Sequence, residues 1–117
     1  MVAKKALSAD GCYKGYLDTL SRVTAYDGRL NTMWSKSTCD AGHHFRPLDE
    51  NGDGVAEAVS VGKYLVARNG ATRCIYPGWG TDHIDSVTID DIDPGQPGLE
   101  MITAGMTGVR MFRAASC

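Results

Sequence analysis

The sequence contains an internal repeat of 42 to 43 residues, and this repeat constrains the fold more than any other feature. An apolar run, an acidic loop and two further apolar runs occur twice in the same order. The acidic loops begin at Asp49 and Asp91, which are 42 residues apart, and the glycines that follow the next run, Gly62 and Gly105, are 43 residues apart. A repeat of this length predicts a supersecondary unit that buries its apolar face by stacking on its neighbours.

Each unit is expected to consist of short antiparallel strands, because its apolar runs are rich in β-branched residues. The expected strands of the first unit are 45–48, 58–62, 63–67 and 72–76, and those of the second are 86–90, 101–105 and 109–113. Asn69-Gly70 and, further upstream, Asp27-Gly28 each separate two such runs. These dipeptides predict tight hairpin turns, because type I′ turns need a positive φ at both central residues.

Four strands per unit and a period near 40 predict an all-β chain of β-propeller blades. The 117 residues hold about two four-stranded antiparallel blades with calcium loops, so the ring is incomplete. We divide the single domain 1–117 into an N-terminal segment (1–21), a hairpin of a preceding blade (22–38), a complete blade (43–78) and a blade without its last strand (83–114). Two blades leave an apolar face uncovered, which predicts copies of the chain associated head to tail in a ring or filament, or further propeller blades, as partners.

Carboxylates are concentrated in the segments 49–57 and 82–100, neither of which contains Lys or Arg. Carboxylates at this density repel each other unless a cation neutralises them. In the first segment, oxygen donors stand at loop positions 1, 3, 5, 7 (a backbone carbonyl) and 9, as Asp49, Asn51, Asp53, Val55 and Glu57. This spacing and the Gly at position 6 follow the first half of the EF-hand rule and predict a Ca²⁺ site, whereas a solvated Asp/Gly turn is the alternative.

The second acidic loop has a looser spacing. Its expected Ca²⁺ ligands are Asp91, Asp93 and Glu100, and two prolines between them stiffen the loop. The alternative is a rigid turn whose acids bind no ion.

The four cysteines lack the CxxC spacing of zinc knuckles and redox motifs. An even number of them, Cys12, Cys39, Cys74 and Cys117, predicts disulfides in any of three connectivities and a secreted protein, whereas four reduced thiols are the alternative. The formal charge of −2 and the pI near 5.8 exclude a typical nucleic-acid-binding domain. No apolar run approaches the roughly 20 residues of a membrane span.

Several of these motifs together resemble a known family. The stretches 43–45, 49–54, 83–85 and above all Asp-x-Asp-Pro-x-x-Pro-Gly-Leu-Glu at 91–100 resemble the propeller of bacterial rhamnogalacturonan lyases of polysaccharide lyase family eleven. Residues 49–57 also resemble the calcium loops of FG-GAP repeats in integrin α-subunits. The resemblance covers roughly residues 22–104.

The resemblance implies an eight-bladed propeller that binds several Ca²⁺ ions and cleaves the pectin backbone by β-elimination. His43 and His83 fall where the family has histidines near its cleft, which makes them the candidate catalytic residues. Their surroundings differ, because the family's Gly-Asn-His-Ser is Gly42–Phe45 here, its Gly-His-Gly-Asp is Asp82–Asp85, and a later histidine is Thr88. Blade architecture and calcium therefore carry over, whereas catalysis by this chain alone does not.

Two further chemistries compete for the remaining side chains. The three histidines, together with Asp40, Asp82 or Asp85, are an alternative transition-metal site, although their separations match no standard spacing and His43 and His44 point to opposite faces of a strand. Trp34, Tyr76 and Trp79 are candidates for stacking on sugar rings, and a place in the core is the alternative.

We therefore interpret the chain as a secreted, calcium-binding propeller-blade module with a structural, self-assembling or carbohydrate-binding role, acidic polysaccharide being the expected carbohydrate. The first alternative is a fragment or dwarf form of a rhamnogalacturonan lyase, and the second is an integrin-like adhesion module.

Overall fold

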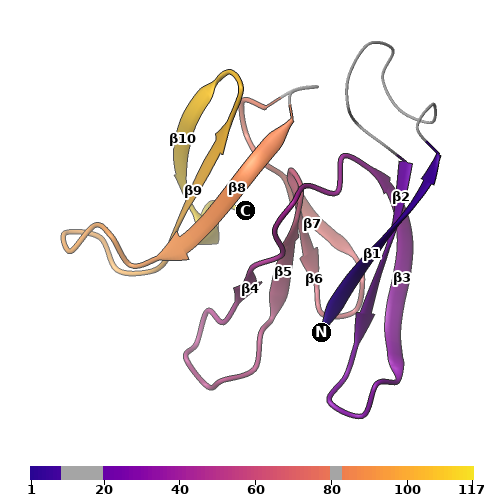
Figure 1. Cartoon of the computed structure of the whole chain (residues 1–117). Coiled ribbons are helices and arrows are strands. Elements are labelled where there is room, and N and C mark those ends of the chain that lie inside the picture. Colours follow the sequence, from indigo (N-terminus) through magenta and orange to yellow (C-terminus); the bar gives the residue numbers. More distant parts are fainter. Residues whose placement is uncertain (9–19, 80–82) are drawn as a thin grey trace.

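The computed structural model describes residues 1–8, 20–79 and 83–117, and this part of the chain is all-β. Its strands form three small antiparallel sheets, which stand side by side with the second sheet between the other two (Figure 1). Within these ranges one 3-10 turn, η1 (Ala114–Ser116), is the only helical element, and no helix is long and apolar enough to cross a membrane. The prediction of an all-β chain is confirmed, and the three sheets do not close a ring.

The three sheets follow one another along the chain. The first has the order β1 (Val2–Ser8), β2 (Leu20–Tyr26), β3 (Thr32–Cys39). The second has the order β4 (Pro47–Leu48), β5 (Ala58–Val61), β6 (Tyr64–Ala67), β7 (Thr72–Ile75). The third has the order β10 (Gly108–Arg113), β9 (Glu100–Gly105), β8 (Ile84–Asp90).

Strands β5 to β10 agree with the predicted strands within one or two residues at each end, whereas β4 covers only the last two residues of the predicted strand 45–48. The third sheet has three strands. Strand β1 is the unexpected element, because no strand was predicted at residues 2–8; the helical turns, irregular chain or outer strand considered for residues 13–22 lie mostly outside the described residues. Strand β1 pairs with β2 from Val2–Ala25 to Ser8–Leu20. Residues 3–7 are all exposed, and their sequence does not alternate between apolar and polar residues. It therefore gives no pattern from which a strand could be predicted.

Both predicted hairpins are present, because β6 pairs with β7 and β2 pairs with β3. Their turns are not of type I′, because neither Asp27 nor Gly28 has a positive φ and only Gly70 has one at the other site. Residues 68–71 separate β6 from β7, and residues 27–31 separate β2 from β3. In the latter loop the Asp27 carboxylate accepts hydrogen bonds from the backbone N–H of Asn31 (2.9 Å) and Arg29 (2.8 Å), and these bonds lower the pKa of Asp27. The side chain therefore organises a wider loop, in which Leu30 adopts the positive φ of 64°.

Two hydrophobic clusters flank the second sheet. Val61 and Val66 pack with Val23, Ala25 and Trp34 of the first sheet. Side chains on the opposite face of the second sheet pack against the third sheet. This second cluster contains Leu48, Ala58, Leu65, Ile84, Val87 and Met101. The alternation along β5 and β6 thus gives the second sheet two buried faces.

Disulfides are present, as the cysteine count predicts. Cys74 of β7 is bonded to Cys117, which follows η1, with a Cα–Cα distance of 5.4 Å. This bond fastens the second sheet to the segment that follows the third. Cys39 is also disulfide-bonded, and Cys12 lies outside the described residues. The alternative of four reduced thiols is therefore wrong.

In each repeat unit, one glycine leaves room for the backbone of the segment that leads into the unit. A Cβ on Gly62 would overlap the carbonyl oxygen of Asp40, and a Cβ on Gly105 would overlap that of His83. Asp40 and His83 each precede their glycine by 22 residues. The glycines are needed because the backbone of the entering segment passes directly over them.

We predict that Gly62→Ala destabilises the protein. Gly62 has φ +53°, so an L-residue there costs about 1–2 kcal/mol from backbone conformation, and the overlap with the Asp40 carbonyl adds to that. Urea unfolding followed by circular dichroism measures the loss. Gly28→Ala is the matched control, because nothing lies within 4 Å of its Cβ position, and it should change stability little. Equal stability of the two variants would contradict the prediction.

Candidate metal centres

The first acidic loop connects β4 to β5 and turns three carboxylates toward one another. One ligand oxygen each from Asp49, Asp53 and Glu57 lies within 4.8 Å of the other two. Asp49 Oδ1 accepts hydrogen bonds from the N–H of Gly52 (2.8 Å) and Asp53 (3.2 Å), and its Oδ2 accepts one from Gly54 (2.7 Å). The backbone N–H groups thus hold Asp49 in place before any ion binds.

The other members of this loop take different roles. Asn51 accepts a hydrogen bond from the N–H of Asp53 (3.0 Å) with its side-chain oxygen. Glu57 accepts one from the N–H of Glu50 (2.7 Å). The Glu50 side chain instead makes a two-pronged ion pair with Arg73 of β7, at 2.9 and 3.0 Å, which raises the pKa of Arg73. The pair removes one of the loop's four carboxylates from the converging group.

This donor set is suited to Ca²⁺. It offers hard carboxylate oxygens in a partly exposed loop whose glycines at 52 and 54 have positive φ angles of 72° and 86°. Ca²⁺ accepts six to eight such oxygens in adaptable geometry, with water completing the shell. The sequence-predicted ligands Asp49, Asp53 and Glu57 are brought together here.

The second acidic loop is arranged differently. Glu100 is 3% exposed, and its Oε2 accepts hydrogen bonds from the N–H of Ile92 (2.9 Å) and Asp93 (3.2 Å), which lower the pKa of Glu100. Its Oε1 is buried and accepts no hydrogen bond from the described residues. Asp91 and Asp93 are exposed. Among the described residues these three carboxylates do not form a converging group.

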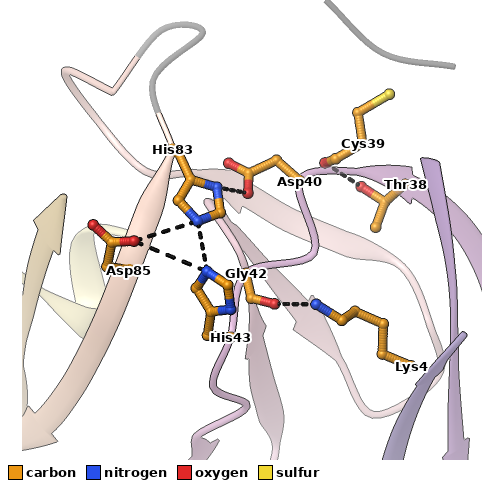
Figure 2. Close-up of polar contacts among 8 residues, drawn as sticks. All are labelled: Lys4, Thr38, Cys39, Asp40, Gly42, His43, His83 and Asp85. Atoms are coloured by element: carbon orange, nitrogen blue, oxygen red, sulfur yellow. Dashed lines mark hydrogen bonds and ion pairs between the residues drawn. The ribbon is translucent and has the colours of Figure 1, made fainter. Parts of the chain in front are cut away.

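A third group of ligand atoms comes from the segments that enter the second and third sheets (Figure 2). His43 lies between β3 and β4, His83 immediately precedes β8, and Asp85 is in β8. The two histidine Nε2 atoms are 3.0 Å apart. Asp85 Oδ1 lies 3.4 Å from Nε2 of His83 and 3.9 Å from Nε2 of His43.

These three atoms form a triangle of the size that surrounds a bound divalent ion. Metal–ligand bonds of about 2.0–2.1 Å in a tetrahedral site place the ligand atoms about 3.3–3.4 Å apart. The observed edges lie on either side of that value. The side chains of His43 and Asp85 are 59% and 53% exposed, so one side of the group is open to water or to a substrate oxygen. An open position of this kind is typical of catalytic rather than structural metal sites.

The remaining sequence candidates lie elsewhere. His44 is exposed and is not part of the group, and Asp82 lies outside the described residues. Tyr76 and Trp79 are each 1% exposed, and Trp34 is 9% exposed. Trp79 donates a hydrogen bond to Thr103 (2.8 Å) beneath the Arg110 guanidinium, which lies 4.1 Å from its ring centroid. Their burial favours the core role over sugar stacking.

The solved structure of rhamnogalacturonan lyase YesW is similar in fold to this chain. The match has a TM-score of 0.59 and 24% sequence identity, and it covers 84% of this chain but 19% of the lyase chain. This chain therefore spans about a fifth of that enzyme, and the likeness shows a shared fold. No protein-family model and no curated protein matches the sequence. The resemblance drawn from the motifs is confirmed to that extent, whereas the propeller organisation and the FG-GAP likeness stay predictions.

We predict that Glu100 contributes to stability at neutral pH and that acid removes this contribution. Folding lowers the pKa of Glu100 below 4.5, so its stabilising effect is complete above that value and is lost as the pH falls through the folded pKa. Urea midpoints measured from about pH 7 to about pH 3 test this. Glu100→Gln should reduce the loss of stability between neutral and acid pH. Glu50→Gln is the control, because Glu50 pairs with Arg73 instead, and it should leave the contribution of Glu100 unchanged. Parallel profiles for the wild type and Glu100→Gln would argue against the prediction.

Proposed function

We propose that this chain is a cation-binding part of a β-propeller related to rhamnogalacturonan lyases and that it binds an acidic, uronate-containing polysaccharide. The observation that carries the proposal is the group formed by His43, His83 and Asp85, which joins two successive repeat units and is open on one side. The shared fold with the lyase supports the choice of polysaccharide.

The chemistry follows from the donor atoms. A divalent cation at this group would neutralise a uronate carboxylate and acidify the adjacent C–H bond, which is the requirement for β-elimination. In this proposal His43, His83 and Asp85 hold the cation, so the two histidines act as ligands and not as the base. The base is not assigned to this chain, which is why we propose binding and not complete catalysis for the 117 residues.

The loop Asp49–Glu57 has a separate, structural role in the proposal. Its carboxylates lie between β4 and β5 and belong to one segment, so a Ca²⁺ ion there would fix the connection between two strands. The disulfide is compatible with a secreted protein, which is the compartment where both Ca²⁺ and extracellular polysaccharide would be available.

A second candidate role is a structural module that packs against further blades or against copies of itself. It is favoured by the large apolar side chains exposed on β10 and the turn before it: Met106 (80%), Val109 (69%) and Met111 (60%). Size measurement in Ca²⁺ and in chelator tests this role, and a monomer that melts identically in both would contradict it.

We predict two separable cation sites. In calorimetric titrations of the chelator-treated protein with Ca²⁺ and with Zn²⁺, His83→Ala should weaken binding at the histidine group by more than about 100-fold and leave the loop site intact. Asp53→Asn should do the reverse, because it removes a carboxylate charge from the loop only. Titrations of both variants that match the wild type would refute the assignment.

We also predict that the protein binds rhamnogalacturonan oligosaccharides in a cation-dependent manner. The chain should bind them in the presence of the cation, and chelator or His83→Ala should abolish binding. Asp53→Asn is the control and should bind normally at the same temperature if it remains folded. A rise in unsaturated-uronate absorbance would show that the chain also cleaves them. Absence of binding with either cation would contradict the proposed substrate class.

A further inference from the structure

We infer that Asp40 is a positioning residue that fixes the tautomer and orientation of His83, so that Nε2 of this histidine is presented as a ligand atom. The inference rests on the proposed function in taking His83 as a cation ligand. It assigns a role to a residue that does not itself belong to the converging group.

The first observation is the contact between the two side chains. Asp40 Oδ1 lies 2.5 Å from His83 Nδ1, while the opposite ring nitrogen, Nε2, faces His43 and Asp85 (Figure 2). The side chain of Asp40 is fully buried, and that of His83 is 18% exposed. A buried carboxylate needs donors around it, because an unpaired charge in the interior is strongly destabilising.

The contact determines where the proton of a neutral His83 resides. An ionised carboxylate has no hydrogen to donate, so this close approach of Oδ1 to Nδ1 is favourable only when Nδ1 carries a hydrogen. The lone pair of Nε2 is then directed toward the ligand group. Carboxylate–histidine pairs of this kind orient metal ligands and increase their basicity, and their loss typically lowers metal affinity about 10–100-fold.

The second observation is that the backbone holds Asp40 independently of any cation. Asp40 has a positive φ of 55°, and its carbonyl oxygen lies against Gly62, where no side chain would fit. The preceding residue, Cys39, is disulfide-bonded. Two residues further on, the carbonyl of Gly42 accepts a hydrogen bond of 2.6 Å from the Lys4 ammonium of β1. These restraints place the carboxylate before a ligand arrives.

The third observation concerns the repeat. Asp40 and His83 occupy equivalent positions, because each lies 22 residues before the glycine over which its carbonyl passes. The pair therefore joins the entry points of two successive units. Its geometry depends on how the second and third sheets pack, so Asp40 couples that packing to the orientation of the ligand.

The pair also explains the contact between the two histidines. With Nδ1 of His83 protonated, its Nε2 accepts a hydrogen bond that His43 donates across the 3.0 Å separation. A cation would replace that hydrogen, after which His43 carries its proton on Nδ1. Only His43 changes its tautomer, and His83 keeps the one that Asp40 imposes.

The first test is a two-bond proton–nitrogen NMR spectrum of the wild-type protein without metal at neutral pH. We expect Nδ1 of His83 to carry a proton, and His44, which is exposed and outside the group, serves as the internal reference. A His83 ring that carries its only proton on Nε2 would overturn the inference. This measurement needs no variant and no bound cation.

The second test is Asp40→Asn, which retains the size of the side chain. Asn tolerates the left-handed backbone conformation as Asp does, so the change removes the charge and leaves the turn intact. We expect His83 to lose its single tautomer and the affinity of the histidine group for Zn²⁺ or Ca²⁺ to fall about 10–100-fold. Asp53→Asn, which affects the acidic loop, should leave both quantities unchanged.

The outcomes separate the two proposals. If Asp40→Asn binds the cation as the wild type does, the positioning role is wrong while the cation site stands. If the wild type shows no binding that His83→Ala removes, the proposed function fails, and the NMR spectrum alone decides whether Asp40 fixes His83. If Asp40→Asn does not fold, the wild-type spectrum likewise decides the inference.

Discussion

The second sheet packs on both of its faces at once, and the rest of the structure depends on that double packing. Val61 and Val66 are buried against the first sheet, and Ala58 and Leu65 are buried on the side of the third. Each fully buried aliphatic side chain contributes about 1.5–3 kcal/mol relative to an exposed one. Sheets of three or four short strands gain little stability alone, so these contacts stabilise the three sheets together rather than each by itself.

This packing places chemistry at the junctions between units rather than within them. The contact between Asp40 and His83 joins the entry segments of two units, and the disulfide between Cys74 and Cys117 joins β7 to the segment after β10. The disulfide closes a span of 43 residues, and bonds of this kind typically stabilise a fold by about 2–4 kcal/mol. A covalent bond and a polar group therefore restrain the same pair of sheets at different places.

The sequence predicted the features that are local and missed those that depend on packing. Strand positions in both repeat units follow from β-branched residues and the period, and the convergence of Asp49, Asp53 and Glu57 follows from spacing within one loop. The hairpin at Asp27-Gly28 is present, but its turn is not of type I′, because the Asp27 carboxylate accepts hydrogen bonds from two backbone N–H groups and organises a wider loop. The pairing of Asp40 with His83 is not apparent from spacing between ligands. Their shared distance of 22 residues from Gly62 and Gly105 was the available signal.

The two proposed cation sites consequently differ in what an ion would stabilise. A ligand that binds only the folded state stabilises it by about 2.7 kcal/mol at a concentration 100 times its dissociation constant. At the Asp49–Glu57 loop the ligands lie within nine residues of sequence, so an ion acts mainly on one connection. At the histidine group the ligands come from segments 40 residues apart that meet only when two sheets pack. An ion bound there would stabilise the packing itself, so the affinity for the cation and the packing of the two units would be thermodynamically linked.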